Sequence, residues 1–176
     1  MTRRRFLSSA MLGTIGLALQ QPVRCLAMPE NRTLHFYHTH TGEKLAVSYG
    51  CPGCYDSQAL HRVNHFLRDF RTDQVHAIDP KLLDILFDVQ CALGHRGTFE
   101  VISGYRSPKT NRLLRARSSG VAKHSLHMDG KAIDIRLTGV RTSKIRQCAL
   151  SLKRGGVGYY RTSDFVHLDT GRVRHW

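Results

Sequence analysis

The chain has 176 residues, of which 41% are hydrophobic and 23% are charged, so it is long enough for one domain with a substantial core. This composition excludes a disordered tail protein and a collagen-like chain. Lys and Arg number 27 against 13 Asp and Glu, and the net charge of +14 favours a polyanionic partner, either nucleic acid or an acidic polymer such as the cell wall.

The first 27 residues have the anatomy of an export signal. Three arginines from Arg3 to Arg5 precede a short apolar stretch over residues 10–19, and small residues follow near Ala27. The segment from Thr2 to Leu7 resembles a twin-arginine signal in particular. We therefore expect residues 1–27 to direct export, either cleaved or retained as an anchor. The working domain over residues 28–176 is then periplasmic or bound to the cell envelope, and we expect no membrane span within it.

The N-terminal part of this domain predicts a hairpin followed by a helix. Residues 33–37 and 45–49 are strand-like and flank a Thr-Gly-Glu turn. Asp56 can cap a helix whose apolar positions from Leu60 to Phe70 keep helical spacing.

The middle of the chain predicts two more helices around one strand. Asp79-Pro80 is a cap followed by a first-turn proline, and this helix stops near Gly94. Residues 98–102 are strand-like and lead into a turn. Ser107-Pro108 repeats the pattern of cap and proline and begins a short helix.

Short strands gather in the last third of the chain. Residues 131–137 alternate as a strand, and Thr142 or Ser143 caps a helix. Two further short strands follow at residues 157–160 and 165–168. The order of these elements predicts a compact single α+β domain with a small antiparallel sheet packed with helices.

Four cysteines lie outside the export signal. Cys51-Pro-Gly-Cys54 is compatible with a redox pair, half a zinc site or a small disulfide, and an exported protein favours the disulfide. Cys91 and Cys148 fall on apolar helix faces, where we expect buried fillers.

The segment from Ser125 to Asp134 contains residues typical of a metal site. His127 in a loop and Asp134 in the next strand can converge on one cation, and Gly130 allows the backbone to turn closely between them. Imidazole and carboxylate groups both suit Zn²⁺, and His167 in the apolar strand near the C-terminus is the third candidate ligand. A histidine between strand hydrophobes is more often a core residue, but three such features in one small domain favour a site.

Three motifs, in order, resemble those of the zinc D-Ala-D-Ala peptidases and murein endopeptidases, whose metallopeptidase core also occurs in hedgehog signalling domains. Residues 125–134 match S-x-H-x-x-G-x-A-x-D, and residues 103–111 match S-G-Y-R-S-x-x-x-N. Residues 165–171 look like the closing strand with its second zinc histidine. Residues 171–176 match the G-x-V-R-x-W ending of an exported, twin-arginine-bearing bacterial branch.

The resemblance implies a role for each matching residue. His127, Asp134 and His167 would hold zinc and so activate water for attack on a peptide carbonyl. Arg106 would bind a substrate carboxylate or polarise the scissile carbonyl. Ser125 would orient the loop that carries His127.

The general base has two candidates. Many family members carry an acid three residues before the last zinc histidine, which is Asp164 here. In a regular strand, however, Asp169 shares a face with His167 and Asp164 does not. We expect Asp164 to be the base, provided that it lies in a loop, and Asp169 to support His167 or to be the alternative base.

These observations predict an exported zinc peptidase that cleaves peptide cross-links of peptidoglycan. Its rivals are a D-Ala-D-Ala carboxypeptidase that trims a free terminus and a zinc-free wall-binding module with the same fold. The hypothesis that the protein binds nucleic acid rests on its charge alone and conflicts with export.

Overall fold

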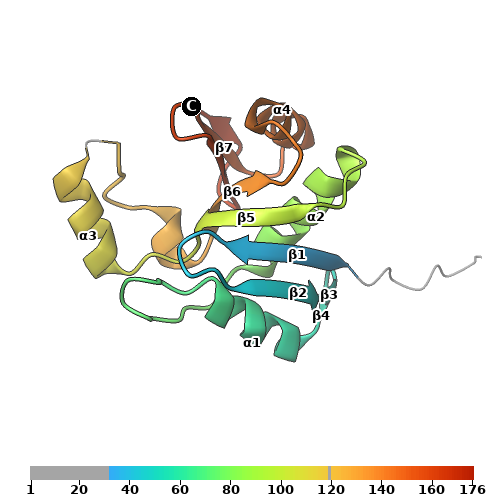
Figure 1. The fold of residues 1–176 in the computed structure, drawn as a ribbon, viewed down its shortest axis with the longest axis horizontal. Helices are drawn as coiled ribbons and strands as arrows, with labels where there is room; N and C mark the ends of the chain where they lie inside the picture. The colour runs from blue at the N-terminus through green and yellow to red at the C-terminus, as the bar shows by residue number, and fades with distance from the viewer. Residues whose placement is uncertain (1–31, 119) are drawn as a thin grey trace, which may run out of the picture.

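The computed structural model describes residues 32–118 and 120–176, so the predicted export signal lies outside the described residues. Figure 1 shows one mixed sheet with helices around it. The strands are β1 (Thr33–His38), β2 (Lys44–Ser48), β3 (Gly50–Cys51), β4 (Cys54–Tyr55), β5 (Thr98–Ser103), β6 (Ala132–Leu137), β7 (Gly156–Tyr160), β8 (Phe165–Asp169) and β9 (Arg174–His175). The helices are α1 (Ser57–Phe66), α2 (Pro80–Ala92), α3 (Pro108–Arg117) and α4 (Thr142–Leu152), with a short 3₁₀ helix, η1 (Leu126–Asp129).

The main sheet has seven strands in the order β2-β1-β5-β6-β8-β7-β9, and β3 pairs with β4 in a separate two-stranded ribbon. Most neighbours are antiparallel, but β1 pairs with β5 and β7 pairs with β9 in parallel. The compact α+β domain is therefore confirmed, with a larger and less uniformly antiparallel sheet than the sequence predicted.

The two faces of this sheet differ in polarity because side chains alternate along each strand. Ile133 and Ile135 of β6, with Val166 and Leu168 of β8, point to a buried core that includes residues of α2 and α4. The intervening residues of these two strands point to the opposite face. That face carries the polar side chains of the candidate site. Helix α3 lies apart from α2 and α4, at the far end of the molecule (Figure 1).

Three predicted helix starts are confirmed. Asp56, Asp79 and Ser107 are the N-caps of α1, α2 and α3, and each side chain accepts a hydrogen bond from a backbone N–H of the first turn. Pro80 and Pro108 occupy the first helical position, where the missing N–H costs nothing. No helix among residues 32–118 and 120–176 is long and apolar enough to cross a membrane.

The predicted extension of α1 to Phe70 is wrong, because the helix ends at Phe66. The carbonyl of Leu67 accepts a hydrogen bond of 2.8 Å from the N–H of Tyr105 in a distant segment. The N–H of Arg71, which would complete the next helical turn on Leu67, donates instead to the carboxylate of Asp69. One tertiary and one local hydrogen bond therefore override the apolar periodicity.

The predicted cap of α4 is also wrong. Arg141 is the N-cap and makes no capping hydrogen bond through its side chain. Thr142 is the first helical residue, and its hydroxyl donates to the carboxylate of Asp164 at 2.7 Å.

The cysteine predictions need correction as well. Cys51 and Cys54 face each other across the β3–β4 ribbon, but both are free thiols rather than a disulfide. The turn between them has Gly53 at φ +81°, so backbone geometry closes the ribbon without a covalent bond. Cys91 is exposed and Cys148 is half-buried, so neither is a fully buried filler.

Asp69 fixes the segment that precedes α3. Its carboxylate is 1% exposed and accepts a hydrogen bond of 2.9 Å from the N–H of Ser107. Burial alone would raise the pKa of Asp69, but hydrogen bonds from Ser107, Thr110 and Arg71 lower the pKa below its usual value. This ionised carboxylate therefore holds the backbone next to Arg106.

We expect Asp69→Ala to lower the free energy of unfolding by about 1–3 kcal/mol, because the buried N–H of Ser107 loses its acceptor. Chemical denaturation measures the change. Asp88→Ala, which removes more exposed ion pairs with Arg154 and Arg32, is the control and should cost less than about 1 kcal/mol. Equal losses for the two variants would contradict this role of Asp69.

Candidate metal centre and active site

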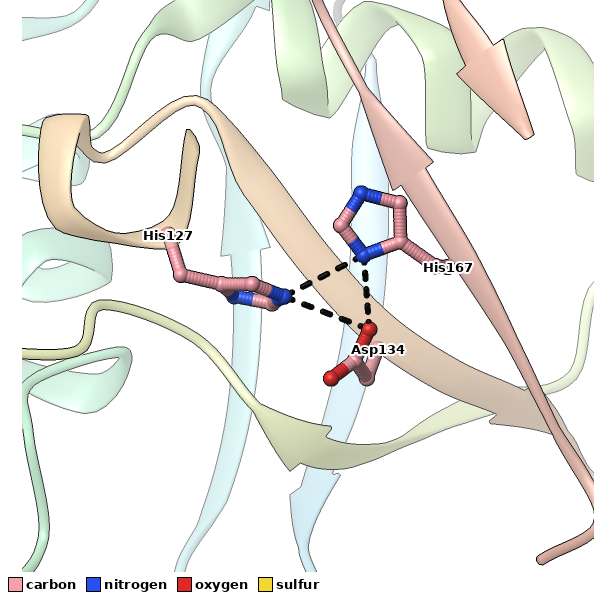
Figure 2. Close-up of side chains that lie close together, drawn as sticks. All are labelled: His127, Asp134 and His167. Carbon is pink, nitrogen blue, oxygen red and sulfur yellow. Dashed lines mark hydrogen bonds and ion pairs between the residues drawn. The ribbon is translucent and has the colours of Figure 1, made fainter. Parts of the chain in front are cut away.

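His127, Asp134 and His167 form a compact buried cluster (Figure 2). The Nδ1 atom of His167 lies 2.9 Å from Oδ1 of Asp134 and 3.2 Å from Nε2 of His127. The Nε2 atom of His127 lies 3.3 Å from the same carboxylate oxygen. The side chains are 2%, 6% and 7% exposed, in chain order. Within the part of the chain that the structure describes, no other group of three or more His, Cys, Asp or Glu residues could hold a metal ion.

Strand register brings two of these residues together. Asp134 of β6 and His167 of β8 are direct partners in the antiparallel ladder, so their side chains leave the same face of the sheet side by side. His127 approaches from η1, whose N-cap is Ser125. The hydroxyl of Ser125 accepts a hydrogen bond of 3.4 Å from the backbone N–H of His127, as expected for a residue that orients this loop.

The end of η1 requires a glycine. Gly130 has φ +65°, and a Cβ atom there would lie 2.1 Å from the carbonyl oxygen of Ala77. The N–H of Asp79 also donates to the carbonyl of Gly130 at 2.9 Å. Close contact with the segment before α2 therefore sets the position of the loop that carries His127.

Hydrogen bonds on the outer nitrogens orient the rings of both histidines. The Nδ1 atom of His127 lies 2.8 Å from the carbonyl oxygen of Gly104. A carbonyl only accepts, so Nδ1 bears the hydrogen and the Nε2 lone pair faces the cluster. The Nε2 atom of His167 lies 3.1 Å from Oδ2 of Asp169, which leaves its Nδ1 atom facing Asp134. Two ring nitrogens and one carboxylate oxygen are a donor set that fits Zn²⁺.

The charges in the cluster depend on one another. Burial opposes ionisation of Asp134, but His127 and His167 lower its pKa well below the usual range. Burial lowers the pKa of His127, so this ring stays neutral at pH 7. Burial also opposes the charge on His167, but hydrogen bonds to Asp134 and Asp169 raise its pKa to about 9. The cluster thus favours a positive charge beside the Asp134 carboxylate. Either a proton on His167 or a bound cation can supply this charge.

A cavity of about 520 Å³ opens onto the cluster, and Arg106 forms part of its wall. The Nη2 atom of Arg106 lies 3.6 Å from Oδ2 of Asp134 and 3.3 Å from the hydroxyl of Ser103. Among the described residues, the buried Nε atom of Arg106 has no hydrogen-bond partner. The guanidinium of Arg106 therefore lies at the wall of the cavity beside the three candidate ligands.

Asp164 does not join this cluster. Its carboxylate accepts from the hydroxyl of Thr142 at the start of α4 and lies 3.7 Å from Nε of Arg136. Its φ of +48° turns the chain just before β8, and the side chain lines a different cavity. The structure therefore does not bring Asp164 together with the three candidate ligands.

Asp169 lies on the same face as His167, as strand alternation predicted. It is 0% exposed, and Arg174 binds both of its carboxylate oxygens at 3.0 Å and 2.7 Å. Both oxygens are therefore occupied by the protein. This arrangement suits a residue that orients His167 and not a base that meets a substrate.

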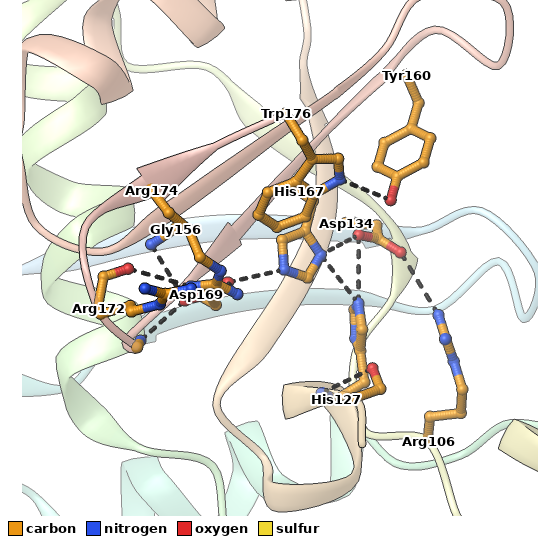
Figure 3. A network of polar contacts seen from close by, with 12 residues as sticks. Arg106, His127, Asp134, Gly156, Tyr160, His167, Asp169, Arg172, Arg174 and Trp176 are labelled. Carbon is orange, nitrogen blue, oxygen red and sulfur yellow. Dashed lines mark hydrogen bonds and ion pairs between the residues drawn. The ribbon is translucent and has the colours of Figure 1, made fainter. Parts of the chain in front are cut away.

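Arg174, Trp176 and Tyr160 complete the site, and the sequence predicted no role for them (Figure 3). Arg174 holds Asp169, and the ring of Trp176 lies 5.3 Å from that of His167. The indole N–H of Trp176 donates to the hydroxyl of Tyr160, and both side chains line the cavity. The G-x-V-R-x-W ending contained Arg174 and Trp176, and this motif was the available signal for both.

Comparison with known proteins identifies a matching family and similar proteins. Residues 26–176 match the family described as Peptidoglycan L,D-endopeptidase MepK. The protein of that name from Escherichia coli (strain K12) is 47% identical over 151 residues, or 86% of this chain and 83% of that protein. A "Probable peptidoglycan L,D-endopeptidase MepK" from Haemophilus influenzae is 44% identical over 179 residues, or 99% of this chain and 95% of that protein. No solved structure matches the chain significantly.

We expect His127→Ala and His167→Ala each to remove bound zinc without unfolding the domain, because the core lies on the other face of the sheet. Elemental analysis of purified protein gives the zinc content, and far-UV circular dichroism reports the fold. His61→Ala, at an exposed position of α1, is the control and should keep its zinc. One zinc per chain in the His127→Ala protein would contradict the site.

We expect Asp169→Asn to weaken zinc affinity about tenfold, because the hydrogen bond that orients His167 changes. Asp164→Asn should retain both zinc and turnover, because its side chain faces Thr142 and Arg136. Competition with a chelator measures affinity, and hydrolysis of cross-linked muropeptides measures turnover. A zinc-replete Asp164→Asn protein that is slower by about 10²–10⁴-fold would restore Asp164 as the base.

Proposed function

The chain belongs to the family described as Peptidoglycan L,D-endopeptidase MepK, and we propose that it is a zinc-dependent hydrolase of peptide cross-links in peptidoglycan. The observation that carries this proposal is the buried cluster of His127, Asp134 and His167 at the base of a cavity. Its two histidines are already oriented by Gly104 and Asp169, so the ligand atoms are arranged before any metal binds. The names of the relatives further support cleavage of a bond between an L- and a D-configured residue.

Bound zinc would supply Lewis acidity and a water of lowered pKa. The protein's own contribution is to exclude bulk water around the ligands and to place a cation where a peptide carbonyl gains negative charge. Arg106 serves this second purpose, because Ser103 and Asp134 fix its guanidinium at the wall of the cavity. Burial lowers the pKa of Arg106, partly offset by Asp134, but the group stays cationic at neutral pH.

The net positive charge of the molecule suits a location at the anionic cell wall. Helix α3 presents an exposed, exclusively basic set of ionisable side chains near the segment that lines the cavity mouth. None of these side chains has an acidic partner among the described residues. The set consists of Lys109, Arg112, Arg115 and Arg117. We infer that it helps to retain the enzyme on the anionic wall, after export directed by residues 1–27 to the periplasm or envelope.

The decisive experiment digests purified cross-linked muropeptides and identifies the products by mass. We expect the wild-type protein to convert dimers into monomers, and we expect a chelator to abolish this activity. Release of terminal D-Ala alone would instead indicate a carboxypeptidase. A zinc-loaded protein that binds but never cleaves muropeptides would indicate a wall-binding module.

We expect Arg106→Ala to lower kcat by about 10²–10³-fold with zinc content unchanged, because a donor to the developing oxyanion is lost. Arg106→Lys should restore only part of the rate, since an ammonium cannot reproduce the guanidinium geometry. Arg161→Ala, at an exposed turn between β7 and β8, is the control with the same loss of charge. An equal effect of Arg161→Ala would reduce the role of Arg106 to net charge.

A further inference from the structure

The C-terminal residue and Tyr160 form a polar pair at the cavity wall. The indole Nε1 atom of Trp176 lies 3.1 Å from the hydroxyl oxygen of Tyr160. An indole N–H only donates, so the phenol oxygen accepts this hydrogen bond. The hydrogen of the Tyr160 hydroxyl therefore remains available, and no acceptor for it is present among the described residues.

The backbone fixes Trp176 firmly although it ends the chain. Strand β9 pairs in parallel with β7, and the N–H of Trp176 donates to the carbonyl of Val157 at 3.3 Å. The N–H of Tyr159 donates to the carbonyl oxygen of Trp176 at 3.1 Å. A Cβ atom at Gly158 would lie 2.7 Å from the indole ring, so this glycine leaves the space that the ring occupies.

Tyr160 is fixed on its other side as well. Its ring stacks on that of Phe165, with centroids 4.5 Å apart and planes inclined by 16°. Both rings line the same cavity as Arg106 and the three candidate ligands. Figure 3 shows the hydroxyl end of Tyr160 directed toward Asp134, whose carboxylate also faces Arg106. A neutral donor and a cationic donor thus lie around one space beside the metal ligands.

We propose that Tyr160 donates a hydrogen bond to the substrate carbonyl oxygen as it gains negative charge, and that Trp176 is the positioning residue that orients the phenol. This inference rests on the proposed function, since it names a second donor for the same hydrolysis. The bond to Trp176 uses the phenol oxygen as an acceptor. Its O–H hydrogen is then available for donation to a group in the cavity that Tyr160 lines.

The alternative is that Tyr160 and Trp176 are only an aromatic wall. An aromatic wall contributes through ring area, which Phe retains, and would bind substrate and transition state equally well. A donor to the developing oxyanion acts mainly in the transition state and therefore appears in kcat. The two roles thus separate in a variant that keeps the ring and loses the hydroxyl.

The test compares Tyr160→Phe with wild type on cross-linked muropeptides, with zinc content measured on the same samples. We expect kcat to fall by about 10²-fold, with KM changed less than about threefold and zinc unchanged. Tyr159→Phe is the matched control, because this neighbouring tyrosine faces Arg146 and a different cavity and should keep the wild-type kcat. An unchanged kcat in Tyr160→Phe would overturn the inference.

A second variant tests the positioning role of Trp176. Trp176→Phe keeps a ring near His167 but removes the N–H, and we expect kcat to fall by about 3- to 10-fold. In the Tyr160→Phe background the same change should have no further effect on kcat, because the hydrogen bond no longer exists. Independent, multiplying losses would show a structural role and overturn this part of the inference.

Failure of the two proposals can be told apart. A zinc-loaded wild type that cleaves no muropeptide overturns the proposed function and this inference with it. A wild type that cleaves normally, together with a Tyr160→Phe protein of equal kcat, overturns only the inference.

Discussion

The pairing of Asp134 with His167 across the β6–β8 ladder is the constraint on which the rest of the site depends. A carboxylate that is 6% exposed must be compensated by positive charge or by hydrogen bonds. Here two imidazole nitrogens meet the same carboxylate oxygen, and Arg106 approaches the other. The site is therefore built around one buried negative charge, and its neighbours serve either to balance that charge or to orient the groups that do.

The three candidate metal ligands could be identified from the sequence because they follow from strand alternation and from local motifs. Residues 133–137 alternate between apolar and polar side chains, which places Asp134 on the face opposite to Ile133 and Ile135. His127 and His167 were candidates from their residue type and position and also match the family motifs, and the structure brings all three residues together. The caps at Asp56, Asp79 and Ser107 were equally predictable, because each depends on a hydrogen bond within one helical turn.

Two differences from the prediction share another origin, namely contacts between segments that are distant in sequence. Helix α1 stops before Phe70 because the Leu67 carbonyl is bound by Tyr105. Asp164 is turned away from the ligands because Thr142 binds its carboxylate at the start of α4. The family pattern favoured Asp164, whereas strand alternation favoured Asp169 as the residue on the face of His167. Strand alternation therefore predicted the positions that Asp169 and Asp164 have in the structure.

Strand β9 explains how Arg174 and Trp176 become part of the site. Arg174 reaches Asp169 only because Gly156 has no side chain, since a Cβ atom there would lie 2.3 Å from the carboxylate and 2.4 Å from the guanidinium. Two residues later along β7, Gly158 leaves the space for the indole of Trp176. Parallel pairing of β9 with β7 places both C-terminal side chains over these two glycines. His167 is thereby supported through Asp169 and Arg174, and Tyr160 through Trp176, so one short edge strand secures both a candidate metal ligand and a wall of the cavity.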